Sequence, residues 1–353
     1  MSAEERLAAS LRDVVGTSAP GVVVVGPDGV RASSAIGRAD LVTRAPMTDG
    51  VVMPWFSMTK IATATTAIRL VEREILALDA PLSVPALELL RPGEWAERIT
   101  LRHLLQHTAG LANPVPVRWI HPADRPGPAA EDFLARLLRK HPKLRFEPGS
   151  RSSYTNLGAL VVGAVVAHAS GTPFESVVQR EVLGPVGMSS TGFAFGAGSA
   201  ATGYHPRRGP MRRLLPRWVL GEPVDRWVGL RPFLLDGAPY GGLVGTAADA
   251  ARFLQMHLAD GQIDGTRVIS VGSATEMRHV NTRGRRFDLG LGWFVPARDR
   301  SADPPYVEHL GAGAGFFNVM RMYPTEQVGA VVMGNATKYD VDAVARLALD
   351  SRG

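Results

Sequence analysis

The stretch Ser57-Met58-Thr59-Lys60 constrains the fold of this chain more than any other, because it opens a long run with helical periodicity. Apolar or small residues recur there at steps of three and four, which marks one buried face of a helix. Those residues are Ile61, Thr65, Ile68, Val71 and Ile75. Residues three apart on a helix have Cβ atoms about 5–6 Å apart, so the Ser57 hydroxyl and the Lys60 amine can share a proton. The spacing predicts a serine nucleophile beside its base.

Lysine is scarce in this chain, which strengthens the interpretation of Lys60. Only four lysines stand against thirty-five arginines, so the chain uses arginine where a plain cation is enough. A buried lysine can lose its proton and act as a base, whereas arginine cannot. The alternative is that Ser57 only caps the helix and Lys60 is solvated, although a capping box would place Glu or Gln, not Lys, three residues after the serine.

Bulk properties favour an ordinary globular protein of two lobes. The 353 residues are 45% hydrophobic, and the absence of cysteine excludes disulfides and thiolate metal sites. Residues 1–15 show the spacing of an amphipathic helix, not the basic and apolar regions of a signal peptide. No run approaches eighteen apolar residues. We therefore expect a cytoplasmic protein with no membrane partner, unless a leader has been removed.

The positive charge has one prominent cluster, from His205 to Arg217, within a formal net charge of +6. Prolines and glycines interrupt it, so we expect a solvated arginine-rich loop or a mobile flap over a cleft, and no nucleic-acid partner. Trp218 and Trp227 flank this loop and are candidates for an apolar acyl pocket. The further aromatic candidates are Trp55, Phe56, Trp119 and Phe233.

The order of the predicted elements indicates an α+β protein. Residues 21–36 predict a hairpin turning at Pro27-Asp28-Gly29. Residues 80–235 show no strand-like alternation and predict an all-helical lobe, including a helix over 99–111. Strand-like runs return at 290–295, 315–323 and 327–333, and a last helix spans about 340–349. We expect a mostly antiparallel sheet domain from residues 1–79 and 236–353, flanked by helices, with a helical domain at 80–235.

Two further segments could complete the chemistry. Tyr154 and Asn156 lie on a loop before an apolar helix, where the tyrosine could act as phenolate or shuttle a proton and the amide could orient a substrate. Near the C-terminus, His309-Leu310-Gly311-Ala312-Gly313 begins a strand whose glycines permit close approach of a ligand, and whose free N–H groups could bind an oxyanion. A strand, rather than a helix, follows these glycines, which disfavours a dinucleotide loop.

These motifs, S-x-x-K, then Y-x-N, then H-x-G, occur in the order found in the class C β-lactamase-like serine hydrolases. The chain resembles that superfamily over nearly its whole length. The superfamily includes D-Ala-D-Ala carboxypeptidases, D-aminopeptidases and the family VIII carboxylesterases, which this chain resembles most in character. The resemblance implies a β-lactamase/transpeptidase-like, penicillin-binding-protein fold.

The resemblance also implies residue roles. Ser57 would be the nucleophile, Lys60 its partner in activation, and Tyr154 the general base for acylation and the proton donor to the leaving group. The backbone N–H groups of Ser57 and Ala312 would form the oxyanion hole. Asn156 would contact the acyl side chain, and His309 and Gly311 would lie at the substrate.

One departure separates the possible activities. Relatives that bind a substrate carboxylate usually have threonine in the middle of the third motif, where this chain has Leu310, and leucine offers no hydroxyl. This favours a serine carboxylesterase on short to medium acyl esters, with water or another alcohol as acceptor. The alternatives are a D-amino-acid peptidase, amidase or D-Ala-D-Ala carboxypeptidase-like enzyme with weak β-lactamase activity, and an inactive binding protein on the same fold.

We expect neither a metal nor another cofactor. His103 and His107 lie four residues apart on the predicted helix, but without the Glu of H-E-x-x-H a structural pair is the better interpretation. The chain has no G-x-S-x-G, which excludes an α/β-hydrolase nucleophile elbow. Nothing in the sequence predicts an oligomeric state.

Overall fold

A seven-stranded sheet in which every neighbouring pair is antiparallel forms the centre of the protein. The computed structural model describes residues 3–25, 33–82, 87, 96–196, 198–209 and 213–350. In spatial order the strands are β12 (Phe287–Leu289), β13 (Phe294–Pro296), β14 (Val307–Gly313), β15 (Phe316–Tyr323), β16 (Val328–Gly334), β1 (Gly21–Val25) and β2 (Ser33–Gly37).

The two ends of the chain meet in this sheet, because β1 pairs with β16. The pairing is reinforced by the Gly21 N–H, which donates to the Asn335 side-chain oxygen at 2.8 Å. The expectation that both ends of the chain build one mostly antiparallel sheet is confirmed. The predicted turn Pro27-Asp28-Gly29 lies outside the described residues.

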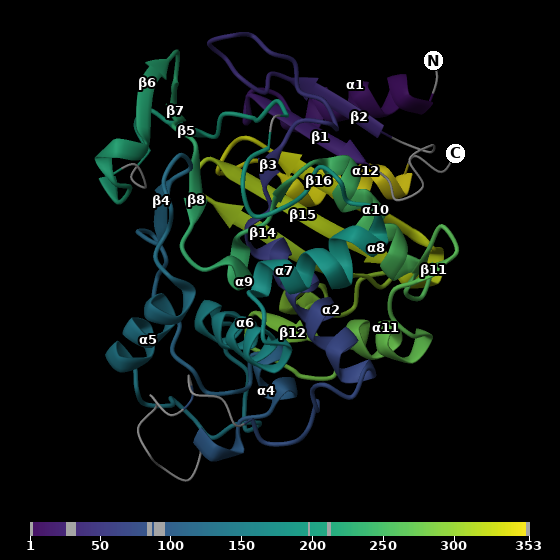
Figure 1. Cartoon of the computed structure of the whole chain (residues 1–353). Helices are drawn as coiled ribbons and strands as arrows, with labels where there is room; N and C mark the ends of the chain where they lie inside the picture. The colour runs from purple at the N-terminus through teal and green to yellow at the C-terminus, as the bar shows by residue number, and fades with distance from the viewer. Residues whose placement is uncertain are drawn as a thin grey trace.

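Helices cover both faces of the sheet. Successive side chains of a strand point to opposite faces, so the apolar residues on each face need such cover. On one face, α1 (Ala3–Val15) and α12 (Val341–Asp350) pack against Val22, Val24 and Val332. On the other face, α2 (Thr59–Glu72) and α10 (Ala247–Leu258) share the larger core with Val23 and Met333. Figure 1 shows the sheet between these two helical layers.

The middle of the chain contains helices and also short strands. The helices are α4 (Leu101–Leu105), α5 (Ala130–Lys140), α6 (Asn156–Ser170), α7 (Phe174–Val178), α8 (Gly184–Val186), with α9 (Ala238–Gly241) and α11 (Val271–Arg278) further on. The strands are β4 (Ile120–Pro122), β5 (Tyr204–Pro206), β6 (Leu220–Val224), β7 (Trp227–Leu230) and β8 (Phe233–Leu235). The prediction of an all-helical lobe over 80–235 is therefore wrong, because these runs are too short to show alternation in sequence. The domain boundaries stay a prediction.

Two predicted elements differ in their limits. The helix expected over 99–111 ends at Leu105, and His107 follows it with a φ of +56°, a left-handed conformation that no helix continues through. Of the strand expected over 290–295, only Phe294 and Val295 lie in a strand, β13. Residues 290–293 form the connection from β12, in which Gly292 adopts a φ of +90°.

No single helix among the described residues has both the length and the apolar character needed to cross a membrane. Helices Asn156–Ser170 and Phe174–Val186, bent by 78°, meet those criteria only when taken as a pair.

Two glycines of β14 allow the turn that carries Ser57 to lie against the strand. A Cβ atom at Gly311 would be 2.2 Å from the carbonyl oxygen of Trp55, and one at Gly313 would be 2.1 Å from the Cε1 atom of Phe56. No side chain other than hydrogen fits at such distances. The glycines of the third motif thus set the separation between β14 and the Ser57 turn.

We expect Gly311→Ala to separate this turn from β14, because the obstructing atom belongs to backbone. Overpacking of this kind costs about 1–3 kcal/mol of unfolding free energy, so the midpoint of thermal unfolding should fall. Gly192→Ala is the matched control, because its Cβ would meet no atom within 4 Å. Equal melting temperatures for the two variants would contradict the close-approach argument.

Candidate active site

Ser57 is held in a short turn fixed by backbone contacts on both sides. It lies in the 3₁₀ turn Phe56–Met58, directly before α2, and Phe56 has a φ of +48°. The N–H of Trp55 donates to the Leu243 carbonyl at 2.8 Å, and the Asn318 side chain donates to the Pro54 carbonyl at 2.9 Å. A left-handed conformation at a bulky residue costs roughly 1–3 kcal/mol and persists only where its surroundings impose it, as these contacts do.

The Lys60 amine lies one helical turn from the serine and is buried, with 4% of the residue exposed. Its Nζ atom is 3.1 Å from the Ser57 Oγ, 2.9 Å from the Asn156 Oδ1 and 2.7 Å from the Tyr240 carbonyl oxygen. The structure therefore brings together the predicted Ser57, Lys60 and Asn156. Within the described part of the chain, no carboxylate forms an ion pair with Lys60.

This environment favours a neutral amine. Burial holds the pKa of Lys60 well below its ordinary value, because desolvation penalises the charged form. The carbonyl oxygens of Tyr240 and Asn156 can only accept hydrogen bonds, so they take the two N–H groups of a neutral amine. In this neutral form the nitrogen lone pair faces the Ser57 hydroxyl, whereas a charged amine would donate its third N–H to the Ser57 Oγ. This geometry suits removal of the serine proton.

The Tyr154 ring lies beside the same amine. Its centroid is 5.0 Å from the Lys60 Nζ, and the side chain is half-buried. Burial raises the pKa of Tyr154, and a hydrogen bond with Ser57 opposes part of that rise. Tyr154 is therefore a protonated phenol at neutral pH. A phenol next to Ser57 is suited to donate a proton, and a neutral Lys60 to accept one.

Tyr154 is positioned by the start of α6. The next residue, Thr155, caps this helix by accepting hydrogen bonds from the N–H groups of Leu157 and Gly158. The N–H of Thr155 also donates to His107 Nδ1 at 3.3 Å. The tyrosine, the amide of Asn156 and His107 are thus fixed by one helix terminus.

Two neutral histidines lie around Tyr154. The His107 ring is 4.5 Å and the His309 ring 6.1 Å from the tyrosine ring, centroid to centroid. Burial lowers the pKa of His107 to about 3 and that of His309 well below its ordinary value. The site therefore has no fixed positive charge from histidine at neutral pH.

The third motif lies along an open stretch of β14. Strand β13 pairs with β14 only through Phe294 and Glu308, whereas β15 pairs with its whole length. Beyond Glu308 the outer edge of β14 faces the Ser57 turn, and Ala312 is exposed there. The roles of Ala312 and Gly311 at the substrate stay predictions, with the Ala312 N–H on the strand that lies against Ser57.

The side chains of the third motif point to opposite faces of the sheet. His309 is buried in the site, where its Nδ1 lies 2.8 Å from the Leu310 carbonyl oxygen and its Nε2 has no partner among the described residues. Leu310 packs on the opposite face, with the core cluster of α1 and α12. Residue 310 therefore contributes only backbone to the site.

The two tryptophans proposed for the acyl pocket are not among the residues gathered at Ser57. Trp227 is buried and packs against Tyr204 in the cluster of α1 and α12. Trp218 is half-buried against the edge of the larger core, and its pocket role stays a prediction. Phe56, the residue before Ser57, contacts Phe233 and Phe316, with ring centroids 6.3 and 6.2 Å apart.

Sequence reasoning missed three contributors to the site. The first is His107, which the sequence predicts only as half of a structural pair. The second is the Tyr240 carbonyl, since a backbone group leaves no pattern in a sequence. The third is Asn113, whose side-chain oxygen accepts from the Asn156 N–H at 3.0 Å. His103 instead closes a capping box with Thr100 at the start of α4.

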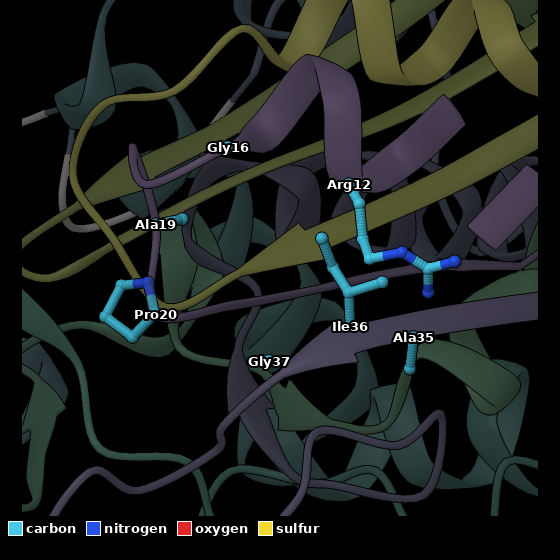
Figure 2. A pocket seen from close by; sticks show the side chains of 7 residues that line it. All are labelled: Arg12, Gly16, Ala19, Pro20, Ala35, Ile36 and Gly37. Carbon is cyan, nitrogen blue, oxygen red and sulfur yellow. The ribbon is translucent and has the colours of Figure 1, made fainter. Parts of the chain in front are cut away.

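The described residues contain no cluster of metal-ligating side chains, and a surface cavity lies away from Ser57. No group of three or more His, Asp or Glu side chains is arranged to hold a metal within the ranges given above. A surface cavity of about 470 Å³ lies between the end of α1 and edge strand β2, and Figure 2 shows Arg12 and Ile36 on its walls. None of its lining residues contacts the Ser57 cluster.

Comparisons with known proteins agree with this arrangement. A family model described as Beta-lactamase matches residues 5–352. The D-alanyl-D-alanine-carboxypeptidase/endopeptidase AmpH of Escherichia coli (strain K12) is 27% identical over 297 residues, which cover 82% of this chain and 71% of the relative. Esterase EstB of Burkholderia gladioli is 30% identical over 305 residues, covering 78% and 74%.

Among solved structures, the D-amino acid amidase from Ochrobactrum anthropi SV3 complexed with D-phenylalanine has a TM-score of 0.80. The likeness covers 99% of both chains at 21% identity. These comparisons confirm the expected β-lactamase/transpeptidase-like fold.

Replacing Lys60 by arginine should abolish the reactivity of Ser57, because arginine cannot accept the serine proton. We expect a fluorophosphonate probe, which phosphonylates activated serines, to label Lys60→Arg at least about 100-fold more slowly than the wild type. Lys140→Arg, at an exposed helix end, is the control and should label normally. Labelling of Lys60→Arg within tenfold of wild type would remove Lys60 from this role.

The labelling rate should also depend on pH in one direction. A neutral Lys60 is present above its lowered pKa, so labelling is fast there and falls as the pH drops through that value. Asn156→Asp places a carboxylate on the amine and should raise the pKa of Lys60 by about 1–3 units. We expect the loss of labelling to move to higher pH by that amount, and an unmoved profile would contradict the neutral-amine assignment.

Proposed function

Because the chain belongs to the beta-lactamase family, a family of serine hydrolases, we propose that it is a carboxylesterase. It would cleave short to medium acyl esters through an acyl-enzyme on Ser57. The observation that carries the serine chemistry is the hydrogen bond between Lys60 and Ser57, while the amine donates two other hydrogen bonds to the carbonyl oxygens of Asn156 and Tyr240.

Acylation follows from the protonation states of the site. Neutral Lys60 removes the Ser57 proton as the Oγ atom attacks the ester carbonyl, and the negative charge that develops on the carbonyl oxygen is held by the N–H groups of Ser57 and Ala312. The resemblance implied Tyr154 as the general base. Its raised pKa and the lowered pKa of Lys60 favour the reverse division, with Lys60 as base and Tyr154 as acid.

Departure of the alcohol uses Tyr154, the acid of the Lys60–Tyr154 pair. The Tyr154 phenol gives its proton to the leaving oxygen as the carbon–oxygen bond breaks, and the Lys60 ammonium restores the tyrosine proton. Water then attacks the acyl-enzyme while the same groups move protons in the opposite direction. Both groups return to their starting states, so the cycle consumes only ester and water.

The charge of the site favours neutral esters over substrates that the enzyme must bind through the substrate's own carboxylate. Both histidines are neutral, and the Leu310 side chain lies on the far face of the sheet. No hydroxyl from the third motif is therefore available to a substrate carboxylate. Similarity to an esterase at 30% identity supports the same choice.

D-amino-acid peptidase or amidase activity is the second candidate. It is supported by 27% identity to a D-alanyl-D-alanine carboxypeptidase/endopeptidase. The proposed proton path serves this reaction too, because Tyr154 could protonate a leaving amine.

We expect wild-type protein to release nitrophenol from p-nitrophenyl butyrate and Ser57→Ala to release none, because the acyl group has no other acceptor in the site. D-alanine p-nitroanilide, assayed in parallel, measures the second candidate. Turnover of the anilide alone would replace the ester proposal by the amidase one. Equal activity of wild type and Ser57→Ala would show that Ser57 is not the nucleophile.

Tyr154→Phe should discriminate between leaving groups. An alkyl alcohol must be protonated to leave, so we expect ethyl butyrate hydrolysis to fall about 10²–10⁴-fold. Nitrophenolate leaves readily without a proton, so p-nitrophenyl butyrate hydrolysis should fall much less. Equal losses on the two esters would contradict the proton-donor role while leaving the esterase proposal standing.

A further inference from the structure

The described residues of the segment 204–231, here named the arginine arm, form a small sheet of their own. The arm contains β5, the 3₁₀ turn Arg217–Val219, β6 and β7. It is attached to the body of the protein at Tyr204, which bridges to Ala336 and packs with Trp227 in the cluster of α1 and α12. Figure 1 shows these strands projecting next to β4 and β8, outside the layered body of the protein.

The arm holds most of the excess positive charge of the chain. Its 28 residues include seven arginines but only Glu222 and Asp225 as acids, a net charge of +5 out of +6 for the whole sequence. The other 325 residues are therefore nearly balanced. Such asymmetry produces a strong local field in an otherwise neutral molecule.

Five arginines of the arm, Arg208, Arg213, Arg217, Arg226 and Arg231, are available to an external anion. All six that the structure describes are exposed: Arg207, Arg208, Arg213, Arg217, Arg226 and Arg231. Within the described residues, no ion pair occupies the last five of these. By contrast, arginines in the body of the protein commonly bind carboxylates, as Arg69 and Arg73 bind Glu181.

Strand register spreads the charge along the arm. Pro206 lies opposite Trp227, which places Arg207, Arg208 and Arg226 near one end. Leu220 lies opposite Leu230, and the Arg231 N–H donates to the Val219 carbonyl, which places Arg217 and Arg231 near the other. The cations form a stripe rather than a single point.

An apolar residue accompanies the stripe. Leu214 lies between Arg213 and Arg217 and is 50% exposed, and half-buried Trp218 follows. Clusters of four to eight basic residues with exposed apolar or tryptophan side chains are typical of protein surfaces that bind anionic lipid headgroups. Single-stranded nucleic acid would need exposed aromatic platforms, whereas Trp227 is buried.

The base of the arm adjoins the active site. Arg231 is two residues before Phe233, whose ring packs on that of Phe56, the neighbour of Ser57. The arm is therefore joined by a short segment to residues that pack on the Ser57 turn.

We propose that the arginine arm binds the surface of an anionic phospholipid bilayer. This departs from the expectation that a membrane is not a partner, which considered spanning segments; peripheral binding needs none. The proposal does not rest on the proposed function, because membrane binding is measured without turnover.

The test is co-sedimentation of the full chain with vesicles. We expect binding to vesicles of 30% phosphatidylglycerol in phosphatidylcholine at low salt and none to pure phosphatidylcholine. Salt should release the protein, since the screening length falls from about 10 Å at 0.1 M to about 3 Å at 1 M. Failure of the wild type to bind the anionic vesicles, including a result in which it binds only single-stranded DNA, would overturn the proposal.

Two charge-reversal variants distinguish binding by the arm from a general effect of the protein's net charge. The arm variant Arg208→Glu/Arg213→Glu/Arg217→Glu should lower the vesicle partition coefficient at least about tenfold. The control Arg283→Glu/Arg285→Glu/Arg286→Glu makes the same charge change at three other exposed arginines and should stay within about threefold of wild type. Equal losses in the two variants would overturn a role for the arm.

A folding defect in the arm variant is detected by circular dichroism. Should one occur, the Arg→Gln variant at the same three positions replaces it, because it removes charge without adding repulsion. We expect that variant to lose at least fivefold in partitioning, and unchanged partitioning would contradict the proposal.

Discussion

The buried amine of Lys60 joins the three segments from which the site is built. Its hydrogen bonds connect α2, which carries the serine turn, to Asn156 at the start of α6 and to the Tyr240 carbonyl in α9. An unpaired charge buried at this point would be costly. Because carbonyl oxygens rather than a carboxylate surround it, the amine is stable as a neutral group. The acceptors that hold the segments together also keep the base free of its proton.

The rest of the sheet domain serves to maintain this contact. Glycines at 311 and 313 bring β14 against the Ser57 turn, and the backbone bonds of Trp55 hold Phe56 in a strained conformation. Burial lowers the pKa of His107 and His309, so both rings are uncharged. A close-packed interior transmits small displacements, so a change in strand separation would reach the hydroxyl–amine distance directly.

Sequence patterns revealed the local parts of this arrangement and missed those that depend on distant contacts. The S-x-x-K spacing, the amphipathic helices and the strands at both ends have a period that can be read from the chain. Strands β4 and β8, in which Ile120 pairs with Leu235, show no such period, since each is three residues long. The sequence predicts His107 within a helix, but tertiary structure imposes a left-handed backbone there that no sequence pattern indicates. A backbone carbonyl such as that of Tyr240 can belong to any residue type.

The pairing of β1 with β16 has a consequence for biosynthesis. The contact between Gly21 and Asn335 closes a loop of 314 residues, and strand β14 lies in the last fifth of the chain. During translation the Ser57 helix leaves the ribosome long before the strand that must lie against it. Sheets of such high contact order form slowly and expose apolar surface meanwhile. The active site must therefore remain unassembled, and its serine unreactive, until β14 and β16 have been synthesised.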